Sequence, residues 1–249
     1  MKKAFASDFD GTLFMHGDYE GFLEEDLQAI REYQKTGNLF GICSGRSLSG
    51  LKGSMHGEIS CDFYIMATGA QILDKDGNTL WEKYLDNETA MKVYEQYRDT
   101  ADIIFHGKDL VYTFGKGYPW QKHIHDLQDL KNDHVYGISL GMFDTEEESV
   151  SLAKDINERF KDKVTAYANV NTIDVTPTGC SKGNGLKKLK ELLNIDLTGG
   201  IGDSYNDETL IEDADIGYTF HRSPEEVRKK ADLLVDTEAE AIRNFSEKQ

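Results

Sequence analysis

Short apolar runs alternate with amphipathic helical patterns at both ends of the chain. Buried strands are predicted at residues 3–9, 38–43, 63–66, 199–202, 216–220 and 233–235, and helices at 24–35, 181–193, 208–212 and 224–230. In the first helix Leu27, Ile30 and Tyr33 share one face, and Gly37 stands where a C-cap glycine belongs. Strands that alternate with helices in this way predict a parallel sheet with helices on both faces.

The middle of the chain follows a different pattern. Helices are predicted at 87–100, between 119 and 135, and from Thr145 onward, and strands at 103–106, 110–114, 135–143, 164–167 and 172–175. Thr145 and Glu148 form a capping box at the start of the third of these helices. Just upstream, Asp76-Gly77 between two short strands signals a hairpin. The middle is therefore predicted to be an α+β block inserted into an α/β chain.

The expected fold class is α/β, a doubly wound Rossmann-like parallel-sheet core with an inserted α+β domain. Residues 1–83 and 178–249 are expected to form the core, and residues 84–177 the inserted domain. Both ends of the chain then belong to the core.

Composition and charge narrow the classes of partner. The 249 residues include no apolar stretch near the ~20 residues that span a bilayer. A net charge of −17 disfavours a nucleic-acid partner, because an acidic surface repels phosphate backbones. Three cysteines match no zinc pattern and no disulfide framework, which favours free thiols and a cytoplasmic location. No membrane partner is expected, and the pattern predicts no particular oligomeric state.

Carboxylates stand at the ends of two predicted core strands. Asp8 and Asp10 follow the first strand, and Gly11 behind them permits a sharp turn. Asp203, Asn206 and Asp207 follow the strand at 199–202. Open α/β sheets bind ligands at the carboxyl ends of their strands. Close carboxylates repel each other and suit a divalent cation, although each piece alone is equally well an acidic loop.

Two further pieces offer groups that suit an anion. Ser44, Gly45 and Arg46 follow the strand at 38–43 and supply a hydroxyl, an approachable backbone N–H and a guanidinium at the start of a helix. Lys182 lies in the first turn of a helix, where the macrodipole disfavours a cation. A lysine at that end suggests pairing with carboxylates or with phosphate. Four such pieces in this order are hard to explain as unrelated loops.

Together these segments resemble the haloacid dehalogenase superfamily of phosphotransferases. The resemblance rests on Asp8-x-Asp10-Gly-Thr as the first motif, Ser44 as the second, Lys182 as the third and Gly-Asp203-x-x-Asn-Asp207 as the fourth. The late lysine and the large insertion before it resemble the Cof-type branch, in which an α/β cap covers the site. Thr68-Gly69-Ala70 is similar to that branch's Asn-Gly-Ala, with threonine in place of asparagine.

The resemblance implies a magnesium-dependent phosphatase. By resemblance, Asp8 attacks phosphorus and Asp10 protonates the leaving oxygen and then activates water. Mg²⁺ is expected on Asp8, the Asp10 carbonyl and Asp203, with Asp207 in an outer position. Ser44, Gly45 and Asn206 are expected to hold phosphate oxygens, and Lys182 to offset charge on Asp8.

The expected substrate is a small phosphorylated metabolite, such as a sugar phosphate, a nucleotide, flavin mononucleotide or pyridoxal phosphate. Arg46 is a candidate for contact with substrate or cap, or for pairing with surface acids. The loop 114–120 is the candidate specificity loop. The cap residues considered for reading the leaving group are His106, Lys116, Tyr118, Trp120 and His123, and each is equally an ordinary surface or core residue.

Two other functions use the same residues. A phosphomutase would return the phosphoryl group of Asp8 to a sugar, but the ~30 residues between Asp10 and Ser44 are too few for the small helical cap such mutases carry in this superfamily. A non-catalytic phosphate sensor would not need every catalytic side chain, and all are present. Asp10 favours hydrolysis of a monoester, because dehalogenases of this fold lack a carboxylate there.

Overall fold

The larger of two main sheets collects strands from both ends of the chain. The computed structural model describes residues 1–17, 20–55, 57–108, 110–115, 117–130, 133–141 and 143–248. The sheet has the strand order β16-β15-β14-β1-β4-β5-β6-β7. The bounds are β1 (Lys3–Ser7), β4 (Leu39–Cys43), β5 (Phe63–Met66), β6 (Gln71–Asp74), β7 (Thr79–Glu82), β14 (Leu197–Ile201), β15 (Ile216–Phe220) and β16 (Leu233–Val235). Strands β16 to β5 are parallel, and β6 and β7 add an antiparallel edge.

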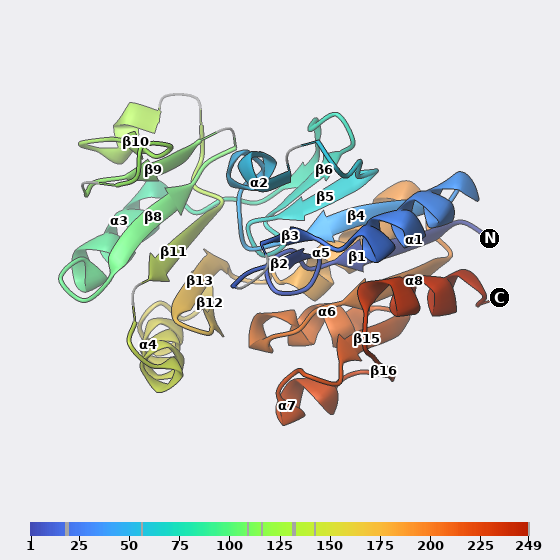
Figure 1. Cartoon of the computed structure of the whole chain (residues 1–249). Coiled ribbons are helices and arrows are strands. Elements are labelled where there is room, and N and C mark those ends of the chain that lie inside the picture. Colours follow the sequence, from blue (N-terminus) through green and yellow to red (C-terminus); the bar gives the residue numbers. More distant parts are fainter. Residues whose placement is uncertain are drawn as a thin grey trace.

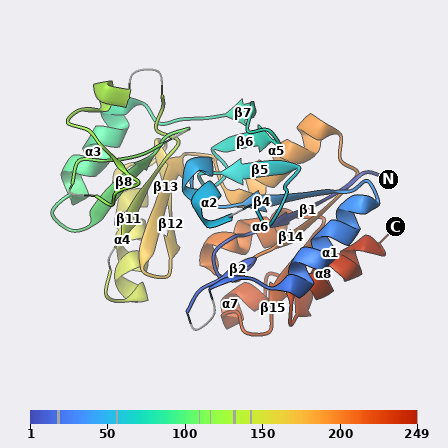
Figure 2. The ribbon, with the colours of Figure 1, turned by 45° about the horizontal axis from the view of Figure 1, so that its top comes forward.

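Helices cover both faces of this sheet, as the alternating pattern predicts. The helices are α1 (Glu24–Lys35), α2 (Leu48–Met55), α5 (Lys182–Leu193), α6 (Glu208–Asp213), α7 (Glu225–Arg228) and α8 (Glu238–Ser246). Apolar residues of α1, α2 and α8 pack with Phe5, Phe40 and Tyr218 on one face, and those of α5 and α6 pack on the other. Helices α1 and α8 lie side by side, and the chain ends lie close together (Figures 1 and 2). A small hairpin, β2 (Phe14–Met15) and β3 (Gly21–Phe22), follows β1.

The second sheet is built from the middle of the chain and lies beside the carboxyl ends of the core strands (Figure 1). Its strand order is β10-β9-β8-β11-β13-β12, antiparallel except for β9 and β10. The bounds are β8 (Asp102–His106), β9 (Val111–Thr113), β10 (Lys122–His123), β11 (Gly137–Gly141), β12 (Val164–Asn169) and β13 (Thr172–Pro177). Helices α3 (Asn87–Tyr97) and α4 (Glu146–Arg159) pack on one face. The other face is turned toward the core, where the Thr176 hydroxyl donates to the Ala67 carbonyl at 3.3 Å.

The predicted α/β class, with a doubly wound core and an inserted α+β sheet, is confirmed by this topology. The capping box at Thr145 and Glu148 is also confirmed. The helix predicted between 119 and 135 is wrong within the described residues, which show the strand β10 and one 3₁₀ turn, η1 (Leu127–Leu130). Its Asp129 carboxylate accepts the N–H groups of His125 and Asp126, and such local bonds compete with helix propagation. Within the described residues, no helix is both long and apolar enough to cross a bilayer.

Candidate active site

The four predicted pieces meet at one edge of the core sheet. β1 pairs in parallel with β4 and β14, so the residues that follow these strands emerge side by side. Asp8 follows β1, Ser44 follows β4, and Asp203 follows β14 by two residues. The Asp8 N–H donates to the Ile201 carbonyl at 2.9 Å, which ties the first piece to the fourth.

Lys182 lies at the centre of the site. It opens α5 directly after the N-cap Ser181, and its side chain is only 1% exposed. Its Nζ donates to Asp8 Oδ1 at 2.6 Å and to Asp207 Oδ1 at 2.5 Å. These two carboxylates supply the negative charge that a cation at a helix N-terminus requires, as the sequence predicts.

Asp207 is also held from its other side. Its Oδ2 accepts the backbone N–H groups of Asp203 and Ser204 at 3.1 and 3.0 Å. The residue is fully buried, and Lys182 and these two N–H groups fix its carboxylate in one orientation. Asp207 therefore serves as a rigid partner for Lys182.

Asp203 completes a group of three carboxylates. Ligand oxygens of Asp8, Asp203 and Asp207 all lie within 4.8 Å of one another. The Thr12 hydroxyl donates to Asp203 Oδ1 at 2.7 Å. Gly11 has φ +82°, and a Cβ there would lie 2.9 Å from Asp203 Oδ2, so both its backbone conformation and its close approach require glycine.

The charges in this cluster do not balance. Burial raises the pKa of Asp8 well above its ordinary value, and the charge of Asp207 raises it further, although Lys182 acts in the opposite direction. Burial and Asp207 likewise raise the pKa of Asp203. Burial alone would lower the pKa of Lys182, but Asp207 and Asp8 outweigh it and raise that pKa. One ammonium is shared among three carboxylates.

The donor set fits a hard divalent cation. Carboxylate oxygens are the ligands that Mg²⁺ prefers, and excess negative charge is what such an ion would neutralise. The Asp10 side chain is not part of this group. Asp207, expected in an outer position, lies within the group but is already bound by Lys182.

Asp10 points to a different set of partners. Arg46 donates from Nε to Asp10 Oδ2 at 2.8 Å and from Nη2 to Oδ1 at 2.6 Å, in a two-pronged ion pair. His16 Nε2 lies 2.8 Å from the same Oδ1. The Arg46 Nη1 group donates to the Gly50 carbonyl and to Ser54. Arg46 thus pairs with the predicted acid/base residue, and His16 is a contact that the sequence motifs did not indicate.

The loop after β4 is supported by the loop after β5. The Thr68 N–H donates to the Ser44 carbonyl at 3.1 Å, and the Ala67 N–H donates to the Arg46 carbonyl at 2.9 Å. Ala67 and Thr68 both adopt positive φ angles, 48° and 53°. This conformation is unfavourable for a β-branched residue, so the surrounding structure must hold it. The Thr68-Gly69-Ala70 segment therefore supports the loop of Ser44 and Gly45.

The second sheet contacts this loop directly. Asp174 of β13 lies against Gly45, where a Cβ would stand 2.5 Å from Asp174 Oδ2. Burial raises the pKa of the Asp174 carboxyl. The amide of Asn206, which is buried nearby, offsets part of this rise. Asp174 was not among the predicted site residues, because its position depends on the register of β13 against the core.

The residues considered for the leaving group are scattered. His106 is buried in β8, whereas Tyr118 and Trp120 are exposed and stack on each other 5.9 Å apart. His123 lies against His125 in an exposed edge-to-face pair. Lys116 lies outside the described residues. Among the described residues of this set, only His106 lies on the buried face near the core.

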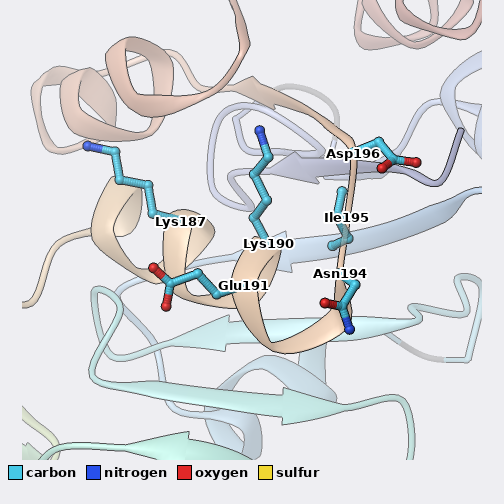
Figure 3. A pocket seen from close by; sticks show the side chains of 6 residues that line it. All are labelled: Lys187, Lys190, Glu191, Asn194, Ile195 and Asp196. Carbon is cyan, nitrogen blue, oxygen red and sulfur yellow. The ribbon is translucent and has the colours of Figure 1, made fainter.

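A surface hollow elsewhere on the core is unrelated to this chemistry. Figure 3 shows it between the end of α5 and the start of β14, opposite the edge where Asp8 and Asp203 emerge. Its Lys187 and Lys190 are paired with Asp213 and Asp215. Neither lysine is thus available to a ligand without breaking an ion pair.

Comparison with known proteins identifies the family. The family model of haloacid dehalogenase-like hydrolases matches residues 5–243. The chain belongs to the haloacid dehalogenase superfamily. It is 26% identical over 252 residues to 5-amino-6-(5-phospho-D-ribitylamino)uracil phosphatase of Bacillus subtilis, covering 98% of this chain and 95% of that one.

Solved structures of this superfamily share the fold. A haloacid dehalogenase-like hydrolase from B. subtilis superposes with a TM-score of 0.84 at 21% identity, covering 100% of both chains. A sugar phosphatase of subclass IIB superposes with a TM-score of 0.75 at 20% identity, covering 98% of this chain and 99% of that one. The protein is thus a Cof-type haloacid dehalogenase phosphatase with a cap inserted before Lys182. Membership implies a divalent metal ion, with which the cluster of Asp8, Asp203 and Asp207 is consistent.

Proposed function

We propose that this phosphatase hydrolyses phosphate monoesters of small metabolites in the presence of Mg²⁺, through a phosphoryl group carried on Asp8. The observation that supports this most strongly is the buried triad of Asp8, Lys182 and Asp207 beside Asp203. A carboxylate is a weak nucleophile, and it becomes effective where its position and the charge around it are fixed. Lys182 provides both for Asp8.

The first step forms a bond between an Asp8 oxygen and phosphorus and breaks the bond to the leaving oxygen. Lys182 Nζ, bound to Asp8 Oδ1, leaves the other oxygen of that carboxylate available for attack. Asp207 orients Lys182 and stays in place because two backbone N–H groups hold it. A bound Mg²⁺ on Asp8, Asp203 and the Asp10 carbonyl would offset phosphoryl charge.

Asp10 supplies the proton to the leaving oxygen and later takes one from the attacking water. Arg46 holds the Asp10 carboxylate through two hydrogen bonds, and His16 contacts it from the solvent side. We assign Arg46 the role of positioning Asp10, because Nε and Nη2 hold the Asp10 carboxylate while Nη1 is bound to Gly50 and Ser54. We favour this role over the contact with substrate or cap that the sequence left open for Arg46.

The phosphate oxygens are assigned to the Ser44 hydroxyl, the Gly45 N–H and the Asn206 amide. Ser44 and Asn206 are buried in loops that follow β4 and β14, the strands on either side of β1. The hydroxyl and both N–H groups can donate to anionic oxygens without bringing further charge into the site.

Residues 84–177 are assigned as the cap domain that selects the leaving group, and residues 1–83 and 178–249 as the catalytic core. The catalytic groups named above all come from the core, so differences in substrate depend on what the cap presents. One relative acts on a phosphoribitylaminouracil, as its name states. We also propose a cytoplasmic location, because all three cysteines are buried free thiols.

The test is turnover of p-nitrophenyl phosphate and of a panel of phosphorylated metabolites by the purified protein with Mg²⁺. We expect steady release of phosphate that stops when EDTA is added and returns with Mg²⁺. Binding of phosphorylated ligands without release of phosphate would instead support the sensor. Transfer of the phosphoryl group to a second position of a sugar, with no free phosphate, would support the mutase.

A further inference from the structure

Three polar side chains form a row across the cap sheet. They are His106 of β8, Ser139 of β11 and Asp174 of β13, and Ser139 stands directly opposite Asp174 in the strand register. His106 Nε2 lies 2.8 Å from Ser139 Oγ, and Ser139 Oγ donates to Asp174 Oδ1 at 3.1 Å. The neighbouring Ile138 packs under the cap helices, so the row lies on the opposite face, toward the core.

The hydrogens in this row can be assigned. The Ser139 hydroxyl has one hydrogen, which it donates to Asp174, so it must accept a hydrogen from His106 Nε2. His106 Nδ1 then carries a lone pair and is an acceptor. Neither His106 Nδ1 nor Asp174 Oδ2 has a partner in hydrogen-bond geometry in the described part of the chain, and the residues are only 5% and 8% exposed. The Asn206 amide lies near enough to the Asp174 carboxyl to lower its pKa but does not make a well-formed hydrogen bond to Oδ2. Two buried acceptors therefore lack donors, which is a costly arrangement unless a ligand supplies them.

The row adjoins the reacting groups. Asp174 Oδ2 lies against Gly45 of the phosphate loop, and the charges of Lys182 and Asp10 act on the pKa of Asp174 in opposite directions. Burial, and to a smaller extent the charge of Arg46, lower the pKa of His106 to about 4. The imidazole is thus neutral at neutral pH. A leaving group attached to a phosphate in this loop would extend toward these acceptors.

We propose that His106 and Asp174 are specificity-determining residues that accept hydrogen bonds from two hydroxyl groups of the leaving group, with Ser139 fixing their spacing. This rests on the proposed phosphatase function and deepens it, since it names phosphate monoesters of neutral polyols as the preferred substrates. Hydroxyls fit better than an ammonium group, because His106 is neutral and the positive charge of Arg46 acts on it. An alkyl or aryl leaving group would leave both acceptors unpaired.

The experiment compares two esters of the same carbon chain, ribitol 5-phosphate and n-pentyl phosphate, each with Mg²⁺. The readout is the ratio of kcat/KM for the polyol ester to kcat/KM for the alkyl ester, which a general loss of activity does not change. His106→Gln can still donate to Ser139 but has no acceptor at the Nδ1 position. Asp174→Asn still accepts from Ser139 but presents an amide NH₂ in place of Oδ2.

We expect the wild-type protein to favour ribitol 5-phosphate, and each of these variants to lower the ratio about tenfold, the usual effect of one lost hydrogen bond of this kind. Ser139→Ala should lower the ratio as well. Ser149→Ala is the matched control, since it removes a buried cap hydroxyl that donates to the Glu146 and Val170 carbonyls. That control should leave the ratio unchanged.

Failure of the inference can be told apart from failure of the proposed function. Unchanged ratios in both His106→Gln and Asp174→Asn, with turnover of n-pentyl phosphate retained, would overturn the inference alone. Preference of the wild-type protein for phosphoethanolamine over ribitol 5-phosphate would also overturn the inference, because it would show that Asp174 binds an ammonium group. Absence of turnover with both esters and with p-nitrophenyl phosphate would overturn the proposed function, and this inference with it.

Discussion

The core side and the cap side of the site differ in how their polar groups are satisfied. In the core, Lys182 binds Asp8 and Asp207, and Arg46 binds Asp10. In the cap, His106 and Asp174 each keep a buried acceptor that no donor among the described residues meets in hydrogen-bond geometry. The core groups are paired and oriented before any substrate arrives, as preorganised electrostatic catalysis requires. The cap groups are incomplete in a way that a leaving group with hydroxyls would complete.

The largest effect is expected from Asp8→Asn on the core side. The amide keeps the size of the side chain but cannot attack phosphorus, so kcat should fall by about 10⁴-fold or more. Phosphate release from p-nitrophenyl phosphate measures this, and thermal unfolding checks that the variant is folded. Asp76→Asn is the matched control, because Asn-Gly suits the β6–β7 turn as well as Asp-Gly does. Turnover within tenfold of wild type in Asp8→Asn would remove Asp8 as the nucleophile.

A smaller effect is expected from Asp203→Asn. The amide oxygen can still accept the hydrogen bond from Thr12, but the side chain no longer carries the charge that binds a cation. The Mg²⁺ concentration for half-maximal activity should rise about a hundredfold, at the upper end of what loss of a supporting group costs a metal site. A Mg²⁺ titration of activity, with Asp76→Asn as control, measures the shift. An unchanged titration would mean that Asp203 does not bind the ion.

The smallest effect concerns stability on the cap side. Burial, and next to it the charge of Arg46, lower the pKa of His106 from 6.5 to about 4. Below its ordinary pKa the unfolded chain binds a proton at His106 that the folded chain does not, so folding loses stability as the pH falls. Lowering the pH from about 7 to about 5 should therefore lower the free energy of unfolding by roughly 2 kcal/mol through His106.

His106→Gln removes this titration and leaves the other histidines in place. Urea unfolding at the two pH values should therefore show a loss of stability in the wild-type protein that is about 2 kcal/mol greater than in the variant. Equal losses in the two proteins would show that His106 is not held in its neutral form by the fold.

The same contrast explains what could be predicted from the sequence. The core residues follow strand ends, and parallel strands bring their ends together whatever the details of packing. Lys182 at a helix N-terminus already implied acidic partners, and the structure provides Asp8 and Asp207. The cap row gave no such signal, because His106 and Asp174 are 68 residues apart in sequence and meet only through the register of β8, β11 and β13.

Other differences arise from loops and local hydrogen bonds. The pairing of Arg46 and His16 with Asp10 depends on how two loops fold back over the sheet edge, which periodicity does not describe. The helix expected before 135 is replaced by a turn that Asp129 caps from its side chain. Helix α8 was not predicted, although the sequence carries its signals. Thr237 caps its start, and Ile242 and Phe245 are spaced to pack into the core.

The central claim is that Asp8 carries the phosphoryl group. Its most direct test is to mix the wild-type protein with substrate and Mg²⁺, stop the reaction with acid at times shorter than one turnover, and examine the peptides by mass spectrometry. We expect the peptide containing Asp8-Phe9-Asp10-Gly11-Thr12 to gain the mass of one phosphoryl group, located on Asp8. Steady turnover with no phosphorylated peptide at any time, or with the phosphoryl group on another residue, would contradict it.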